Sequence, residues 1–165
     1  MDEVTRYDID GFDKVTRALL ELVNGYPKLD YGETFSFGIV DSESGIAFIP
    51  SSGASITREI EDITGHVTQD CVYPFTILYK ASGLSENRKI DIKEWLDDLG
   101  RWLGKQPISY QGQEYKITEY PALTRERKIV NIQSTSPSFL NEVTESNVET
   151  WLLTMQATYK NEFDR

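Results

Sequence analysis

Few residues in this chain could carry acid–base or nucleophilic chemistry, and they are scattered. His66 is the single histidine and Cys71 the single cysteine among 165 residues. A catalytic triad or a zinc site needs further imidazole groups, or cysteines in their place. His66 follows a Thr-Gly turn and is typical of a surface residue, whereas Cys71 precedes an apolar run and is typical of a small buried side chain. Neither predicts a catalytic site, and a single cysteine excludes an internal disulfide.

Carboxylates gather at two places in the sequence, which are Glu59, Glu61 and Asp62, and then Asp97 and Asp98. A divalent cation prefers several carboxylates that converge from different elements. Neighbours on a helix point about a third of a turn apart, so Asp97 and Asp98 do not chelate together. We interpret Asp97 as an i,i+4 partner of Arg101 on a solvated helix face.

The glycines form none of the motifs that bind dinucleotides or phosphates, or that expose a nucleophilic serine. The sequence therefore predicts no catalytic, cofactor-binding or metal-binding residue. We expect a protein that is not an enzyme and that needs no cofactor.

The charge balance bears on possible partners. Seventeen Lys and Arg against 27 Asp and Glu give a net charge of −10. This argues against nucleic acid as a bound partner, because basic patches drive phosphate binding. It leaves open a surface that DNA slides past, and the cluster Arg125, Arg127 and Lys128 could form a local patch. No apolar run approaches the ~20 residues of a membrane span, and residues 1–4 lack the features of a signal peptide, so we expect synthesis in the cytosol.

The elements that must position any site are organised around residues 72–103. Tyr73–Lys80 alternates large apolar and smaller or polar side chains, which predicts a strand. A polar connection, Ala81–Ile90, leads to an amphipathic helix, Ile92–Leu103. Its apolar stripe consists of Ile92, Trp95, Leu96, Leu99, Trp102 and Leu103.

The ends of this helix also have sequence signals. Asp91 and Glu94 predict an N-terminal capping box, and Ile90 and Trp95 are spaced as a hydrophobic staple. Gly104 suits the left-handed position after the helix, and Pro107 blocks its continuation.

Pro74 interrupts the apolar strand. Proline cannot donate to a ladder, so this strand is expected to lie at a sheet edge or to carry a bulge.

The other predicted elements are one helix, several strands and a long loop. Residues 56–63 suit both a helical face and a hairpin strand, and we interpret them as a strand. Residues 1–10 are compatible with a flexible arm, and 134–147 are expected to form a long loop, a class that is often functional. The remaining predictions are a helix over 11–24, strands over 35–40, 46–50, 128–133 and 151–159, a turn at 41–45, a small hairpin over 108–117 and a polar tail over 160–165.

This order of elements predicts a single α+β domain over 1–165. We expect one mostly antiparallel sheet with two main helices packed on one face. The strand connections are too short for repeated right-handed crossovers, which argues against a doubly wound fold.

Two stretches, Tyr73–Lys80 and Ile90–Leu103, resemble minor capsid proteins of tailed phages and prophages of Gram-positive bacteria, a family similar to tail terminators among head–tail joining proteins. The resemblance is closest over 35–103 and includes the placement of the strand at 151–159. It implies a tail-terminator-like α+β fold in the virion, made in the host cytoplasm. It also implies a ring, typically of six copies, that contacts the tail tube protein and the head-completion or connector protein. DNA would only pass through its channel, with no membrane, enzyme activity or cofactor. It transfers no functional residues, so the loop 134–147 and the Pro74 strand are our own candidates for contact surfaces.

Two other classes of function remain open from the sequence. An acidic inhibitor or immunity-type protein would use its negative surface to occupy the site of a basic partner. A small enzyme that uses carboxylates alone would show a metal-dependent thermal shift.

Overall fold

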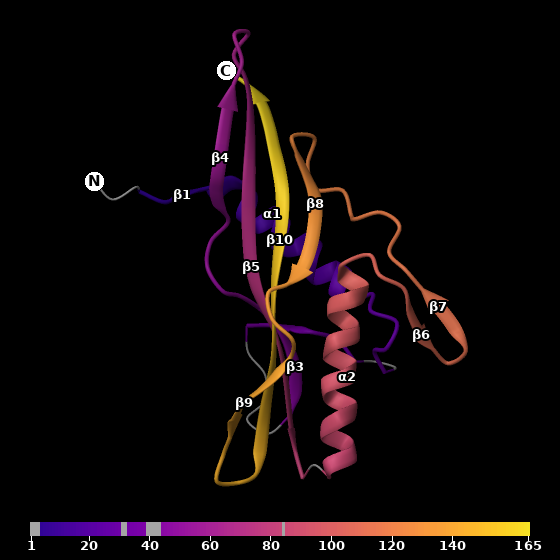
Figure 1. Ribbon diagram of the computed structural model, residues 1–165. Coiled ribbons are helices and arrows are strands. Elements are labelled where there is room, and N and C mark those ends of the chain that lie inside the picture. Colours follow the sequence, from indigo (N-terminus) through magenta and orange to yellow (C-terminus); the bar gives the residue numbers. More distant parts are fainter. Residues whose placement is uncertain (1–3, 31–32, 39–43, 84) are drawn as a thin grey trace.

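The computed structural model describes residues 4–30, 33–38, 44–83 and 85–165 (Figure 1). It is an α+β fold with two helices and a mostly antiparallel sheet, as predicted. The elements in chain order are β1 (Arg6–Tyr7), α1 (Ile9–Val23), β2 (Ser36–Phe37), β3 (Gly45–Pro50), β4 (Ser55–Glu61), β5 (His66–Ser82), α2 (Glu86–Leu103), β6 (Ile108–Tyr110), β7 (Gln113–Tyr115), β8 (Arg127–Ser134), β9 (Phe139–Val143) and β10 (Val148–Asp164).

Two long strands, β5 and β10, form the centre of the sheet and run the length of the molecule (Figure 1). They pair antiparallel without a register shift from His66 against Asp164 to Ser82 against Val148. On the far side of β5, β4 pairs with its first half and β3 with its second half. On the far side of β10, β8 and β9 divide the strand in the same way. Short strands β1 and β2 extend β4 and β3 outward.

Both helices cover the same face of the sheet. The odd-numbered side chains of β5 point to this face and most are fully buried. Helix α1 reaches Tyr73 through a hydrogen bond of 2.6 Å between the Thr16 and Tyr73 hydroxyls. Helix α2 contacts β10, where Gly100 lies against Leu153. The opposite face carries the even-numbered side chains, which are partly exposed from Thr68 to Lys80; we call it the open face.

The structure explains Pro74 differently from the sequence prediction. β5 is an inner strand with no bulge against β10, so Pro74 marks neither a sheet edge nor a bulge. It lies where the partner of β5 changes, after Val72 pairs with Ser55 of β4 and before Phe75 pairs with Pro50 of β3. The Pro74 carbonyl accepts from Ser51 N at 3.0 Å, so the missing N–H points to this gap between strands. The Pro74 strand is therefore not a free contact surface.

Helix α2 begins six residues before its predicted start. Ser85, not Asp91, is the N-cap and accepts from Arg88 N at 3.2 Å. The capping box at Asp91 was therefore wrong, because that residue lies inside the helix. At the other end Lys105, not Gly104, takes the left-handed conformation, with φ of 62°. The predicted apolar stripe is confirmed, with Trp95 only partly buried.

Other boundaries also differ from the predictions. The expected loop 134–147 contains β9, and the expected polar tail continues β10 to Asp164. β2 pairs with β3 in parallel rather than returning as a tight hairpin; residues 39–43, which include most of the predicted turn, lie outside the described residues. The strand at 56–63 and the hairpin at 108–117 are confirmed as β4 and as β6 with β7.

Two neighbouring substitutions in α2 should have opposite effects on stability. Leu99 is fully buried, so Leu99→Ala should lower the free energy of unfolding by ~2–5 kcal/mol through a cavity. Gly100→Ala should instead raise it by ~0.5–1 kcal/mol, because a helical glycine is entropically costly and an added Cβ would meet only ordinary contacts at 3.7 Å. Urea unfolding of both variants gives the measurement. A loss below ~1 kcal/mol for Leu99→Ala would show that this face is not core.

Candidate interaction surfaces

The single histidine and the single cysteine lie in environments that are typical of structural residues. His66 is partly exposed at the start of β5, and its ring lies 2.8 Å from Asp164, whose hydrogen bond raises the pKa of His66. Cys71 is buried, and burial raises the pKa of its thiol to about 11. A buried thiol with a raised pKa is typical of a structural rather than a reactive cysteine.

The acidic cluster on β4 does not converge on one point. Glu59 accepts from Gln69 at 2.7 Å and pairs with Arg6, while Glu61 pairs with Arg165 at 2.8 Å. Asp62 accepts from Thr64 N and His66 N and so closes the β4–β5 turn. Within the described ranges, no three His, Cys, Asp or Glu side chains form a group that could hold a metal ion.

The basic cluster near β8 is divided by burial. Arg127 makes a two-pronged contact with Asp8, through Nε at 2.9 Å and Nη2 at 2.7 Å. The Tyr159 hydroxyl donates to the same carboxylate at 2.7 Å, and Gly11 N donates at 3.1 Å from the first turn of α1. Only Arg125 and Lys128 of the cluster remain exposed, so the three residues do not form one patch.

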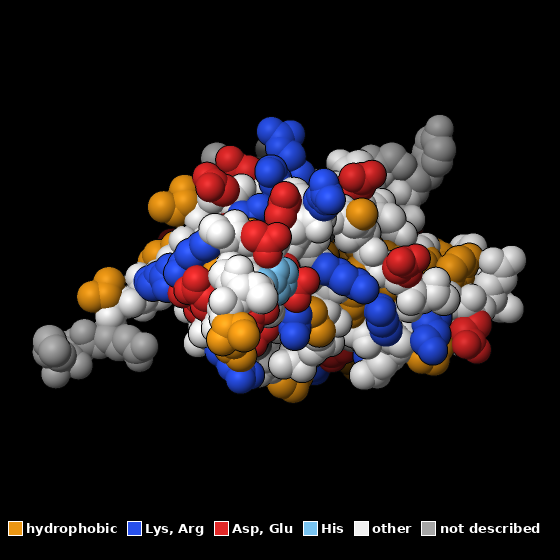
Figure 2. All heavy atoms as spheres, turned by 90° about the horizontal axis from the view of Figure 1, so that it is seen from above, with side chains coloured by type: hydrophobic (Ala, Val, Ile, Leu, Met, Phe, Trp, Pro, Cys, Tyr) orange, Lys and Arg blue, Asp and Glu red, His pale blue; other side chains and the backbone are white. Residues whose placement is uncertain are grey.

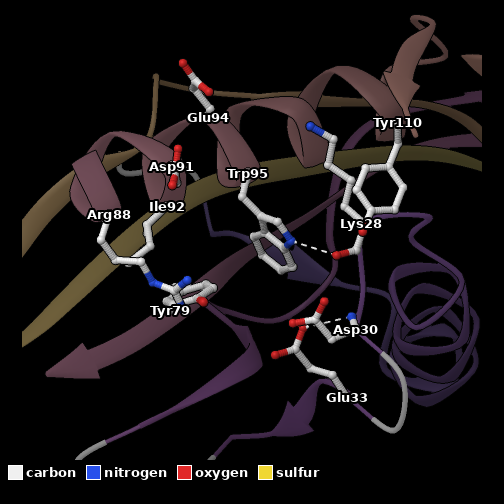
Figure 3. A pocket seen from close by; sticks show the side chains of 10 residues that line it. All are labelled: Lys28, Asp30, Glu33, Tyr79, Arg88, Asp91, Ile92, Glu94, Trp95 and Tyr110. Carbon is white, nitrogen blue, oxygen red and sulfur yellow. Dashed lines mark hydrogen bonds between the residues drawn. The ribbon is translucent and has the colours of Figure 1, made fainter. Parts of the chain in front are cut away.

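The hollow drawn in Figure 3 lies beside the N-terminal half of α2 and has a volume of about 270 Å³. Trp95 forms part of its wall and donates from its indole N–H to the Lys28 carbonyl at 3.0 Å. Asp30 and Glu33 lie on the opposite side, and burial raises the pKa of Glu33. Carboxylates beside aromatic rings could hold a basic side chain, but the described residues that line this hollow include no nucleophile with an adjacent base.

A set of polar contacts fixes the start of β9 against α2. The Asp97 carboxylate accepts from Ser138 N at 2.9 Å, and the Ser138 hydroxyl donates to the Lys93 carbonyl at 3.2 Å. Lys93 Nζ in turn contacts both Asp97 and the Ser138 carbonyl. The predicted Asp97–Arg101 pair was therefore wrong: Asp97 pairs with Lys93, and Arg101 pairs with Asp98. Ser138 is 3% exposed, so these contacts hold the residue directly before β9 in one position against α2.

The outer strands of the sheet carry most of the large apolar side chains that the described residues expose. On the β10 side these are Val130 of β8 and Phe139, Leu140 and Val143 of β9. On the β5 side they are Tyr7 of β1, Phe37 of β2 and Ile60 of β4. Edge strands with exposed apolar groups are the usual sites of pairing between chains. The sequence predicted a contact segment over 134–147 in the form of a loop, whereas the structure shows that Phe139–Val143 within it form a strand.

These edges also have features that oppose uncontrolled pairing. The registers of β4, β8 and β9 each shift once along their partner strand. Such bulges, together with charged residues such as Lys128, are ordinary protections of edge strands. The edges are thus available for pairing without being strongly adhesive.

The end of the molecule that bears the β4–β5 turn carries charges of both signs. Figure 2 looks onto this end and shows acidic side chains interleaved with basic ones around the histidine. Arg165 bridges Glu59 and Glu61, and Lys160 lies 3.9 Å from Asp70. This end therefore offers no large patch of one sign for a strongly charged ligand.

Neither described helix is long and apolar enough to cross a membrane.

Comparison with known proteins gives similarity to solved structures but not to known families. No protein-family model matches the chain, and no curated protein matches it. A chain from a solved structure titled "Virion of native gene transfer agent (GTA) particle" is similar, with a TM-score of 0.49 and 13% sequence identity. The similarity covers 94% of this chain and 100% of that chain.

Proposed function

We propose that this chain is a structural subunit of the virion of a tailed phage or prophage, and that it acts as a tail terminator. In this role several copies, six in the class that the sequence resembles, form a ring at the end of the tail tube. The sequence resemblance over Tyr73–Lys80 and Ile90–Leu103 supports this assignment. The partners are the tail tube protein on one side and the head-completion or connector protein on the other.

Open edges on both sides of one sheet carry the proposal. A closed ring is built head to tail, so each copy must offer two different surfaces that fit one another. The β8–β9 side and the β1–β4 side of the sheet are two such surfaces, and both expose apolar side chains. A symmetric dimer would need only one of them.

The open face suits a channel that DNA traverses without binding. It presents neutral polar groups beside apolar ones such as Val72, Leu78 and Leu152; the polar groups include Thr68, Thr76, Thr154, Gln156 and Thr158. One row across four strands, formed by Arg58, Asp70, Lys160 and Lys128, carries three positive charges and one negative charge. The other charged strand residues that the structure describes on this face are Lys80, Glu142, Glu162 and Asp164, so the two signs balance over the face as a whole. A face of this kind neither attracts DNA as a basic stripe would nor repels it as a carboxylate wall would.

A subunit that waits for a tube end must stay soluble beforehand. The net charge of −10 makes free copies repel one another at low salt. The bulged edges add a barrier to spontaneous pairing. We expect mostly monomer in dilute solution, with rings favoured by high concentration, raised salt or the tube itself.

The position of the protein in the particle tests the proposal. Gold-labelled antibody against the chain should bind negatively stained particles at the junction of head and tail, and free tails at one end only. Particles without this gene product provide the control for nonspecific label. Label on the head surface or at the distal tip of the tail would contradict the proposal.

A further inference from the structure

We infer that the β9 edge of one copy pairs with the β4 edge of the next copy. This inference rests on the proposed ring and assigns the two surfaces that would close it. The β9 edge is the outer side of Phe139–Val143, and the β4 edge is the outer side of Thr57–Glu61 beyond the end of β1. Within the described residues, β9 pairs only with β10, and this part of β4 pairs only with β5.

A hollow borders the part of β4 at which the proposed edge begins. A hollow of about 520 Å³ lies along Ser55–Glu59 and the segment Val4–Arg6. β1 contacts β4 only at Arg6 and Tyr7, and Val4 beyond it is 83% exposed. Among the described residues, no strand pairs with the outer side of β4 past this point, so its backbone groups there could accept a neighbouring strand.

The strand directions of the two edges are compatible. β4 is antiparallel to β5, and β5 is antiparallel to β10, so β4 runs in the same direction as β10. β9 is antiparallel to β10. One step of rotation around a ring of six turns a strand by at most a sixth of a turn, whatever its tilt. The neighbour's β9 therefore meets β4 closer to antiparallel than to parallel, which extends the antiparallel ladder between copies.

The side chains on the open face also match in type and spacing. Phe139 lies across from Leu152 and Glu142 across from Thr150, which places both on the open face two residues of β10 apart. On β4, Ile60 lies across from Thr68 and Arg58 across from Asp70, with the same face and spacing. Antiparallel pairing thus sets Phe139 against Ile60 and Glu142 against Arg58 at the same time.

The four side chains are available for these contacts. Phe139 is 39% exposed and Ile60 is 48% exposed. Neither Glu142 nor Arg58 takes part in an ion pair with any side chain that the structure describes. Cross-strand pairs of apolar groups and of opposite charges each stabilise a sheet. The Ser138 contacts with α2 hold β9 in place before pairing, which lowers the entropy cost of association.

This pairing requires neighbouring copies to be displaced relative to one another along the strand direction. Phe139 pairs with Leu152 of β10. Ile60 pairs with Thr68 of β5, which in turn pairs with Glu162 of β10, ten residues further along that strand than Leu152. This is a stagger of ~33 Å along the strands. Closure of a sheet around an axis requires tilted strands and a staggered register, so a displaced contact is the expected kind.

A cross-linking experiment in solution tests the contact. Glu142→Cys and Arg58→Cys are made in separate chains, mixed at high concentration and treated with a short bismaleimide. The expected product is a cross-linked pair in the mixture, absent when either variant is treated alone. The natural Cys71 is buried and should not react. Ile63→Cys, which is fully exposed at the β4–β5 turn, replaces Arg58→Cys in a control mixture that should give no product.

Charge reversal gives a second measurement. Glu142→Arg or Arg58→Glu, each combined with a cysteine pair at Phe139 and Ile60, should reduce the cross-linked fraction about fivefold, and both reversals together should restore it. Product from Glu142→Cys alone would show a symmetric contact and overturn the inference, as would no product in the mixture. Because this measurement uses isolated protein, a failure here leaves the tail-terminator role to be decided by particle phenotype.

Discussion

Arg127→Ala is expected to destabilise the protein by about 3–5 kcal/mol, because it leaves the Asp8 carboxylate buried without its cation. Both side chains are at most 10% exposed, and Asp8 serves three elements at once. It caps α1 through Gly11 N, pairs with Arg127 at the start of β8, and accepts from Tyr159 of β10. A Cβ on Gly11 would overlap both charged groups, so this packing also requires glycine.

Urea unfolding of Arg127→Ala and of Lys128→Ala measures this effect. Lys128 is the exposed neighbour, and its substitution should change the free energy of unfolding by less than ~0.5 kcal/mol. Asp8→Asn should cost less in an Arg127→Met background than in the natural protein, because the buried charge has already lost its partner. Equal and small effects at 127 and 128 would contradict a stabilising role for the buried pair.

The pH dependence of the same comparison has a defined sign. Burial alone would raise the pKa of Asp8, but hydrogen bonds from Arg127 and Tyr159 outweigh it and lower the pKa below its usual 3.8. The stabilisation is therefore complete above that value and is lost as the pH falls through the lower folded-state pKa. The difference in stability between natural protein and Arg127→Ala should accordingly be constant near neutrality and shrink below about pH 4.

The sequence predicted the central elements because burial imposes a period on them. β5 alternates large and small side chains since one face meets the helices, and α2 carries an apolar stripe for the same reason. The first turns of α2 were missed because Glu86, Asn87, Arg88 and Lys89 add nothing to that stripe. The helix begins at Glu86, directly after the N-cap Ser85, whose cap signal lies in an otherwise polar segment.

The contact surfaces were harder to predict from sequence. β9 does not alternate, because its register shifts between Leu140 and Glu142, and a bulge removes the period of two by which strands are recognised. The pairing of Asp8 with Arg127 joins residues 119 positions apart, and no local pattern marks it. Pro74 was a true signal of an interrupted ladder, but only the structure shows that two shorter strands share that side of β5.

The second large effect concerns tail assembly in a phage or prophage that lacks this gene. A terminator ring stops growth of the tube by occupying its end, so without it tubes should grow past their normal length and fail to join DNA-filled heads. A head-completion protein acts on the other partner, and its loss should leave tails of normal length that stay unattached. The two roles therefore differ in one observable quantity, the length of free tails.

The distribution of tail lengths in a deletion strain, measured by negative-stain electron microscopy, tests the central claim most directly. The natural gene supplied in trans serves as the control and should restore normal particles. Complementation with the combined charge reversal, Glu142→Arg with Arg58→Glu, should also restore length, whereas either single reversal should do so less completely. The terminator role predicts long, headless tubes of variable length in the deletion strain. Free tails of uniform, normal length would contradict it.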